Sequence, residues 1–223
     1  MQNIFILLLS SLFWFGSPEI QTKEKNWPAE LNTAKDALYL NELEREVILE
    51  LNKVRSDPKR YSKEYIEELV TAFKGNLYFY PGQEPTKSEE GIKPLMECIQ
   101  VLRNTKPLPI LSPAEGLAKA SRLLVKDQQF GGIGHITRNG STPQKRIEKY
   151  GNWDICSGED ITYGSFLARQ MVIALLIDDG VPDRGHRKNV LSPCFHFAGV
   201  AYGGNPTYRS MCVIDYAGDY QTK

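Results

Sequence analysis

Histidine is scarce in this chain, which has only three among its 223 residues. The motifs that often carry hydrolytic chemistry are also missing, because there is neither an HExxH sequence nor a GxSxG sequence. The four cysteines form no CxxC pair and no Cys/His ligand spacing, so the sequence does not indicate a structural zinc knot. Lys+Arg and Asp+Glu each number 27, and this balance argues against a nucleic-acid partner held by a general basic field.

Long hydrophobic runs are lacking as well. Residues 4–14 (IFILLLSSLFW) are apolar, but this run is too short to cross a bilayer, which takes about 20 residues. The run fits the apolar region of a secretory signal, which we expect at 1–17; a buried N-terminal helix is the alternative. The signal predicts a secreted or periplasmic protein, in which one or two disulfides can form. Pairing stays open, with buried free thiols as the alternative, for Cys98, Cys156, Cys194 and Cys212.

Helical periodicity dominates the first two thirds of the chain, after a polar and loose lead-in at 18–38. Apolar residues recur every three or four positions in several segments, each with one apolar face. The first helix should stop near Asp57, because the following proline disfavours helical geometry there. Residues 76–91 are rich in proline and glycine and are expected to be a loop. Helices are predicted at 38–57, 61–73, 94–102, 112–125, 141–150 and 165–179, the last ending at Gly180.

Two helix starts carry specific signals. Ser112 can accept from the backbone N–H of Glu115, with Pro113 at the first helical position, as in a capping box. Ser141 precedes a second start, whose helix Gly151 is expected to end in a left-handed cap.

The chain ends in strands. Residues 195–203 and 208–218 flank Gly-Asn-Pro-Thr and predict a β-hairpin, and residues 155–164 (ICSGEDITYG) predict a third strand. Several helices with a small antiparallel sheet, and no βαβ alternation, predict an α+β domain in which helices cover the sheet.

Four titratable residues stand at the edges of these elements: His135, Glu159, His186 and an acid at 178 or 179. The Gly-Val-Pro turn after the two aspartates can bring His186 back to the end of the preceding helix. Two imidazoles can then hold one divalent cation, while the carboxylates orient the rings. The same groups can instead form a metal-free acid–base cluster with shifted pKa values.

The blocks GHITRNGSTPQKRI, SGEDITYG, DDGVPDRGHRKNVLSP and FAGVAYG, in this order, resemble the CAP superfamily, the cysteine-rich secretory, antigen 5 and pathogenesis-related proteins, also called SCP-domain proteins. The resemblance covers about 39–219 and is most specific from 112 onward. It is closest to the non-animal branch with a long insert, here 58–111.

The resemblance implies a three-layer α–β–α sandwich with a small antiparallel sheet between helical layers. It also implies a cleft lined by two histidines and two acids, here the tetrad His135, Glu159, Asp178 and His186. The histidines His135 and His186 would hold zinc or another divalent cation. Asp178 stands where the family has Glu, with Asp179 as the alternative, and Asp160 replaces the usual Asn.

Two functions are compatible with this resemblance. The first is a secreted, non-enzymatic binding module for a small hydrophobic ligand such as a lipid or sterol, a glycan or a peptide. The second is a metal-assisted hydrolase in which a carboxylate activates water at the bound cation. The binding module is favoured because catalytic zinc usually has three protein ligands. In a third interpretation the tetrad only stabilises the fold. We expect a monomer with no nucleic-acid partner and no transmembrane span in the mature chain.

Overall fold

The computed structural model describes residues 26–79 and 85–223, so the predicted signal at 1–17 lies outside the described residues. The helices are α1 (Glu42–Ser56), α2 (Pro58–Tyr61), α3 (Lys93–Asn104), α4 (Glu115–Gln128), α5 (Pro143–Tyr150), α6 (Ala168–Ile177) and α7 (Gly185–Val190), with short helical turns η1 (Ala29–Leu31), η2 (Ser62–Ile66) and η3 (Glu67–Ala72). The strands are β1 (Phe73–Lys74), β2 (Leu77–Tyr78), β3 (Thr86–Lys87), β4 (Ser112–Pro113), β5 (Gly151–Tyr163), β6 (Phe197–Asn205) and β7 (Arg209–Thr222).

The central sheet has four strands in the order β4-β6-β7-β5. The predicted hairpin is confirmed as the antiparallel pair β6–β7, and the predicted third strand is confirmed as β5, antiparallel to β7. The short β4 lies parallel to β6. Because β5 is at an edge of this sheet, side chains from both helical layers can meet beside it.

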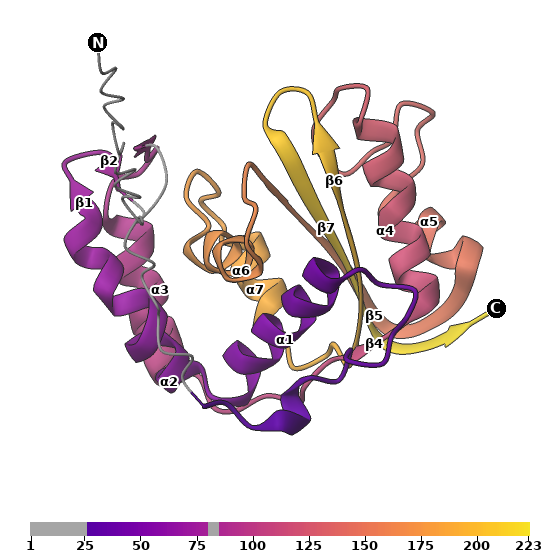
Figure 1. The fold of residues 1–223 in the computed structure, drawn as a ribbon, viewed down its shortest axis with the longest axis horizontal. Coiled ribbons are helices and arrows are strands. Elements are labelled where there is room, and N and C mark those ends of the chain that lie inside the picture. The colour runs from indigo at the N-terminus through magenta and orange to yellow at the C-terminus, as the bar shows by residue number, and fades with distance from the viewer. Residues whose placement is uncertain (1–25, 80–84) are drawn as a thin grey trace, which may run out of the picture.

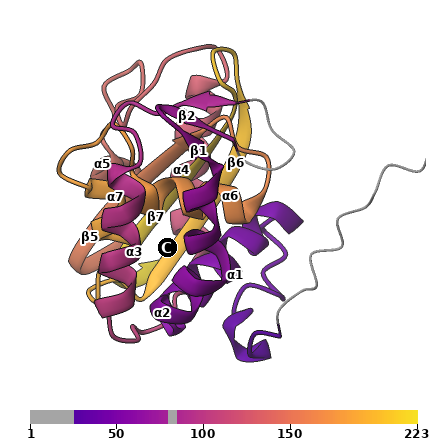
Figure 2. The ribbon, with the colours of Figure 1, turned by 90° about the vertical axis from the view of Figure 1, so that its left-hand side faces the viewer.

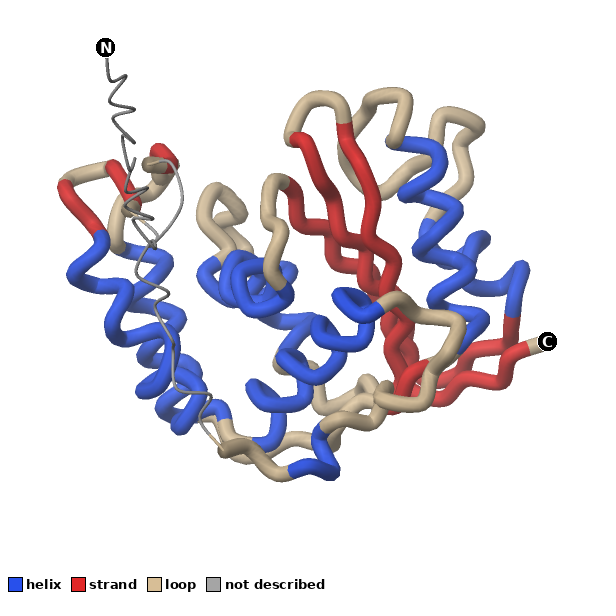
Figure 3. Tube along the Cα trace, viewed as in Figure 1, coloured by secondary structure: helices blue, strands red, loops and turns tan. Residues whose placement is uncertain are grey.

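Helices cover both faces of the sheet, which confirms the α+β class and the α–β–α layering (Figure 1). One layer is α4 with α5, and the other is α1 with α6 and α7. Beyond α6 lie α2 and α3 with the small sheet β1–β3, which Figure 2 shows from the outside. Figure 3 shows that this outer part is mainly helical.

The apolar faces predicted from periodicity form the core. Val47, Leu51 and Val54 of α1 are fully buried. On the opposite face of the sheet α4 approaches β6 very closely at Gly199, where an added Cβ would lie 2.0 Å from the backbone nitrogen of Ala118. Only glycine allows the helix to pack at this depth.

The lead-in is more closely packed than its polar sequence predicts. In its described part, 26–38, the side chains of Leu31 and Ala34 are buried. Asn52 of α1 donates to the carbonyl oxygens of both Leu31 and Leu111, at 3.0 and 3.1 Å. The described part of the lead-in is therefore packed against the domain.

Within the insert the predicted second helix is only partly helical. After α2 the backbone passes through a π turn at η2 and a 3-10 turn at η3, and Phe73 begins β1 instead of ending a helix. The β-branched pair Val70–Thr71 weakens helical propensity here. The predicted loop at 76–91 is also corrected in its described part, because it contributes β2 and β3.

Both predicted helix-start details are corrected. Ser112 is not a helix cap: its N–H donates to the carbonyl of His196 at 2.8 Å, so the segment joins the sheet as β4, and α4 begins at Glu115. The fifth helix is capped by Thr142 rather than Ser141. Gly151 does not adopt a left-handed cap, because its extended backbone begins β5. An added Cβ there would lie 2.3 Å from the Tyr220 ring.

Arg55 ties α1 to the far end of the insert and to the segment between α7 and β6. Its buried guanidinium donates to the carbonyl oxygens of Pro109, Val190, Ser192 and Phe195 at 2.8 to 2.9 Å. Burial lowers the pKa of Arg55 to about 10. These bonds fix the position of α7.

Cys156 and Cys194 form a disulfide, and Cys98 and Cys212 are buried free thiols. The bond joins β5 to the segment before β6. It lies beside an irregularity in the β5–β7 register, between Asp154 and Ser157. The disulfide therefore secures the edge strand where its pairing is interrupted.

We expect the double substitution Cys156→Ser/Cys194→Ser to lower the free energy of unfolding by about 3–4 kcal/mol, because the bond closes a long loop. The two cysteines are 38 residues apart. The urea midpoint of the variant should equal that of the wild type measured under reducing conditions, where the disulfide is broken. An unchanged midpoint would contradict a stabilising role for this bond.

Candidate functional site

The first acid–histidine pair lies at the outer edge of β5. His135, in the loop after α4, places its Nδ1 2.8 Å from Oε1 of Glu159. The Glu159 side chain is buried on β5, whereas 44% of the His135 side chain is exposed. One face of this imidazole therefore meets solvent while its Nδ1 is fixed.

Arg146 of α5 holds this pair in place. Its guanidinium binds the second carboxylate oxygen of Glu159 and is itself buried. It also donates to the backbone carbonyls of His135, at 3.0 Å, and Ser141, at 2.9 Å. One buried cation thus positions both the acid and the loop that carries the histidine. Sequence reasoning did not single out Arg146, which looks like any cation in a polar helix.

The second pair lies in the opposite helical layer, where α6 ends. Asp178 adopts a left-handed conformation, with φ 58°, and its Oδ1 is 2.6 Å from Nδ1 of His186. Its other oxygen accepts the N–H groups of His186 and Arg187 at the start of α7. The hydrogen bond to Asp178 raises the pKa of His186.

These bonds correct the predicted helix end and decide between the two aspartates. The helix stops at Ile177, before the predicted Gly180, because the Asp178 carboxylate is captured by α7. Asp179 points elsewhere: it accepts the N–H groups of Glu89 and Glu90 at 2.8 and 3.0 Å. The acid beside His186 is therefore Asp178.

Hydrogen bonds from the insert hold the turn that precedes His186. Glu90 accepts the N–H of Gly180 at 3.0 Å, and both of its oxygens bind Arg184, at 2.6 and 2.8 Å. Arg184 also bonds Glu97 of α3 at 2.9 Å. Together with Asp179, these contacts link the predicted insert 58–111 to the site.

The two imidazoles of the predicted cleft lie close to each other. Their ring centroids are 6.5 Å apart and their planes differ by 30°. Each Nδ1 is engaged by a carboxylate, which leaves each Nε2 as the available ligand atom. A carboxylate on one ring nitrogen is the usual outer partner of a metal-binding histidine. Within 26–79 and 85–223, no cluster of three or more His, Cys, Asp or Glu residues suits a metal, so the pair offers two protein ligands.

Two further acids are fully buried behind this cleft. Asp160 accepts from Asn189 Nδ2 at 2.7 Å and from the Tyr216 hydroxyl at 3.1 Å, and burial raises its pKa to about 7. Asp215 lies opposite Glu159 on β7 and accepts from the Ser121 hydroxyl at 2.8 Å. Burial, with the nearby charge of Glu159, raises the pKa of Asp215 well above its ordinary value.

Asp215 was not among the sequence candidates, although one signal was present. It interrupts the apolar run Met211–Tyr216, and an acid in such a run is costly unless it is neutral or paired. His196, the third histidine, lies outside the cleft. It is exposed, and its Nδ1 bonds the carbonyl of Gly218 at 2.8 Å.

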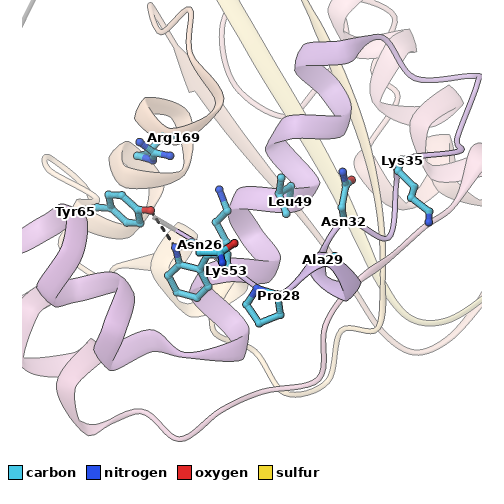
Figure 4. A pocket seen from close by; sticks show the side chains of 10 residues that line it. Asn26, Pro28, Ala29, Asn32, Lys35, Leu49, Lys53, Tyr65 and Arg169 are labelled. Carbon is cyan, nitrogen blue, oxygen red and sulfur yellow. Dashed lines mark hydrogen bonds between the residues drawn. The ribbon is translucent and has the colours of Figure 1, made fainter. Parts of the chain in front are cut away.

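A separate hollow of about 360 Å³ lies between the lead-in and α1 (Figure 4). Trp27 and Tyr65 contribute its rings, with the Trp27 N–H donating to the Tyr65 hydroxyl at 3.0 Å. Two of its cations, Lys53 and Arg169, pair with buried Glu50. No tetrad residue lines this hollow.

Comparison with known protein families places this chain in one of them. The sequence model of CAP, the cysteine-rich secretory protein family, matches residues 96–216. This chain belongs to the CAP family. No curated protein matches the sequence.

Two solved structures are similar to it. One is an extracellular protein containing an SCP domain from Bacillus anthracis str. Ames, with 20% identity over 56% of this chain and a TM-score of 0.38. This CAP chain spans 38% of that protein. The other is an outer surface protein from Borrelia burgdorferi, with 19% identity over 65% of this chain and 98% of that one, and a TM-score of 0.39.

We expect Asp160→Asn to flatten the pH dependence of stability. Folded Asp160 keeps its proton to about pH 7, whereas an aspartate in the unfolded chain loses its proton near the ordinary pKa of 3.8. The folded state binds more protons across this window, so this group's contribution to stability falls as pH rises through it. Relative to wild type, the variant should gain up to about 1 kcal/mol per pH unit between these limits.

Urea denaturation across this pH window measures the difference. Asp36→Asn, which changes an exposed aspartate, should keep the wild-type profile. Parallel profiles for Asp160→Asn and wild type would show that Asp160 does not hold a proton in the folded protein.

Proposed function

We propose that this CAP domain is an extracytoplasmic, non-enzymatic binding module whose His135 and His186 hold a divalent cation such as zinc. The observation that carries the proposal is the pair of imidazoles 6.5 Å apart, each oriented by a buried carboxylate. Both rings have their outer partners in place, which leaves the Nε2 atom of each ring to bind the ion. The bound ion would supply a positive centre in the cleft.

The donor set favours binding over hydrolysis. Catalytic zinc sites usually combine three protein ligands with one open position. The cleft provides two nitrogens, and both acids are occupied in orienting the rings. Glu159 is further engaged by Arg146, so its two oxygens serve the pair rather than a water molecule.

A second cavity, of about 410 Å³, supports the binding role. It lies between the small sheet and α6, and its apolar walls include Phe73, Tyr78, Tyr163, Ile173 and Tyr208. This size is within the range of small-molecule sites, roughly 300–1,000 Å³. Its lining suits a small hydrophobic ligand better than a glycan or a peptide.

Two features support an extracytoplasmic location. The apolar run at 4–14 fits a secretory signal. The Cys156–Cys194 disulfide is typical of oxidising compartments. In the part of the chain that the structure describes, the helices are too short or too polar to traverse a bilayer.

Zinc titration by calorimetry tests the metal site directly. The wild type should show one saturable site, which His135→Ala and His186→Ala should each weaken by more than about tenfold, since each removes a ligand. Binding should also weaken as the pH falls through the pKa of His186, which its hydrogen bond to Asp178 raises above the ordinary 6.5, because protonated imidazoles do not coordinate metals.

The third histidine provides a matched control. His196→Ala should leave zinc affinity unchanged, because His196 lies outside the cleft. Circular dichroism should show that all three variants are folded. Equal zinc binding by the His135→Ala/His186→Ala double variant would reject the site.

The contacts between the insert and the turn before His186 predict that a substitution in the insert lowers zinc affinity, but by less than the loss of a ligand. Glu90→Gln should weaken the grip on the turn before His186 and lower zinc affinity by roughly two- to tenfold, less than the loss of a direct outer partner. Glu67→Gln is the control, because Glu67 pairs with Arg103 elsewhere in the insert, at 2.7 Å. Equal affinities for the two variants would show that the insert does not position His186.

A further inference from the structure

Large apolar side chains are exposed together at one end of the domain. In the described ranges twelve such side chains are exposed, and half of them lie on three loops, at 129–142, 164–167 and 205–209. We call these six residues the apolar tip: Phe130 (70% exposed), Ile133 (63%), Ile136 (52%), Phe166 (44%), Leu167 (59%) and Tyr208 (44%). The connections after α4, after β5 and between β6 and β7 all lie at the upper end of Figure 1.

Hydrogen bonds and ring contacts join the three loops into one surface. Asn205 donates to the carbonyl of Gly132 at 3.2 Å, and the N–H of Gly134 donates to the Tyr163 hydroxyl at 3.0 Å. The Tyr163 and Tyr208 rings lie 5.1 Å apart. The second loop is held as well, because the hydroxyl of Ser210 donates to the carbonyl of Ser165 at 2.8 Å.

The backbone of the first loop keeps its apolar side chains outside the core. Gly131, Gly132 and Gly134 have φ values of 106°, 105° and 84°, a region that side chains rarely adopt. Gln128 also donates to the carbonyl of Gly134 at 2.6 Å. This hydrogen bond and the backbone conformation hold the loop in place, with Phe130 and Ile133 exposed.

The charged side chains of the three loops have one sign. The three loops contain no Asp or Glu, and they contain Arg138 and Arg209. Each guanidinium lies over a ring of the tip: Arg138 is 5.3 Å from the centroid of Phe130, and Arg209 is 5.1 Å from that of Phe166. Arg138 also pairs with Asp127 at 3.2 Å, which leaves Arg209 as the stronger contribution to a positive rim.

We propose that the apolar tip docks this domain onto a bilayer surface that contains anionic lipids. Apolar side chains beside arginines match the boundary between acyl chains and anionic headgroups. Side chains carried on separate loops can each enter a fluid bilayer, whereas a protein partner would need a pocket for each. Exposed apolar patches of this kind mark interaction surfaces. The proposal is independent of metal at the tetrad, because none of the six residues of the apolar tip belongs to the tetrad.

Vesicle flotation of the full-length protein tests the proposal. Vesicles of phosphatidylcholine with phosphatidylglycerol are compared with vesicles of phosphatidylcholine alone. The triple variant Phe130→Ser/Ile133→Ser/Phe166→Ser should lose about tenfold or more in partitioning to the mixed vesicles. The control Leu38→Ser/Met96→Ser/Val101→Ser changes three exposed apolar residues elsewhere, at 92%, 48% and 38% exposure, and should partition like wild type.

The apolar run at 4–14 is present in every protein compared, so a difference between variants is assigned to the substituted residues. Arg209→Gln should reduce partitioning to the mixed vesicles only. Equal partitioning by the tip and control variants would overturn the proposal, as would a wild type that binds neither vesicle. A dimer in light scattering that only the tip variant abolishes, without vesicle binding, would assign the surface to a second copy instead.

Discussion

The candidate cleft depends on the buried carboxylate of Glu159. A buried charge is tolerated only when it is paired and hydrogen-bonded, and Arg146 and His135 together meet this need. Meeting it has structural consequences, because Arg146 comes from α5 and also binds the backbone of the loop that carries His135. The edge strand, one helix and the long loop after α4 are thereby fixed relative to one another by a single acid.

Asp178, the second buried acid of the tetrad, also needs hydrogen-bond partners, and different groups provide them. Asp178 is buried at a helix end, and its oxygens are satisfied by the His186 ring and by two backbone N–H groups of α7. The loop between α4 and α5 supplies one histidine and α7 the other, so the two rings meet beside the edge strand β5, which carries Glu159. A grip from the insert, through Glu90 and Arg184, holds the second half in place.

Local patterns were enough to predict much of this arrangement. Apolar periodicity located α1 and α3, and the hairpin at the C-terminus followed from its turn residues. Ser112 shows where such reasoning stops: a cap and a strand have the same local sequence, and pairing with β6 decided between them. Arg146 and Asp215 illustrate another limit, since their roles arise from which buried partner lies opposite, and that depends on the β5–β7 register. The sequence could not decide which aspartate lies beside His186, because the choice depends on the hydrogen bonds between Asp178 and the start of α7.

The buried acids near the two imidazoles differ in their hydrogen-bond partners. Asp160 and Asp215 have no cation of their own among their hydrogen-bond partners, and burial raises the pKa of each. Glu159 instead accepts from the guanidinium of Arg146, and Asp178 accepts from two backbone N–H groups of α7. The acids that hold the imidazoles are therefore hydrogen-bonded to N–H donors of neighbouring elements, whereas Asp160 and Asp215 are the acids whose pKa burial raises. Each ring is held by a carboxylate at its Nδ1, which is the usual outer partner of a metal-binding histidine, and the proposed cation site rests on this arrangement.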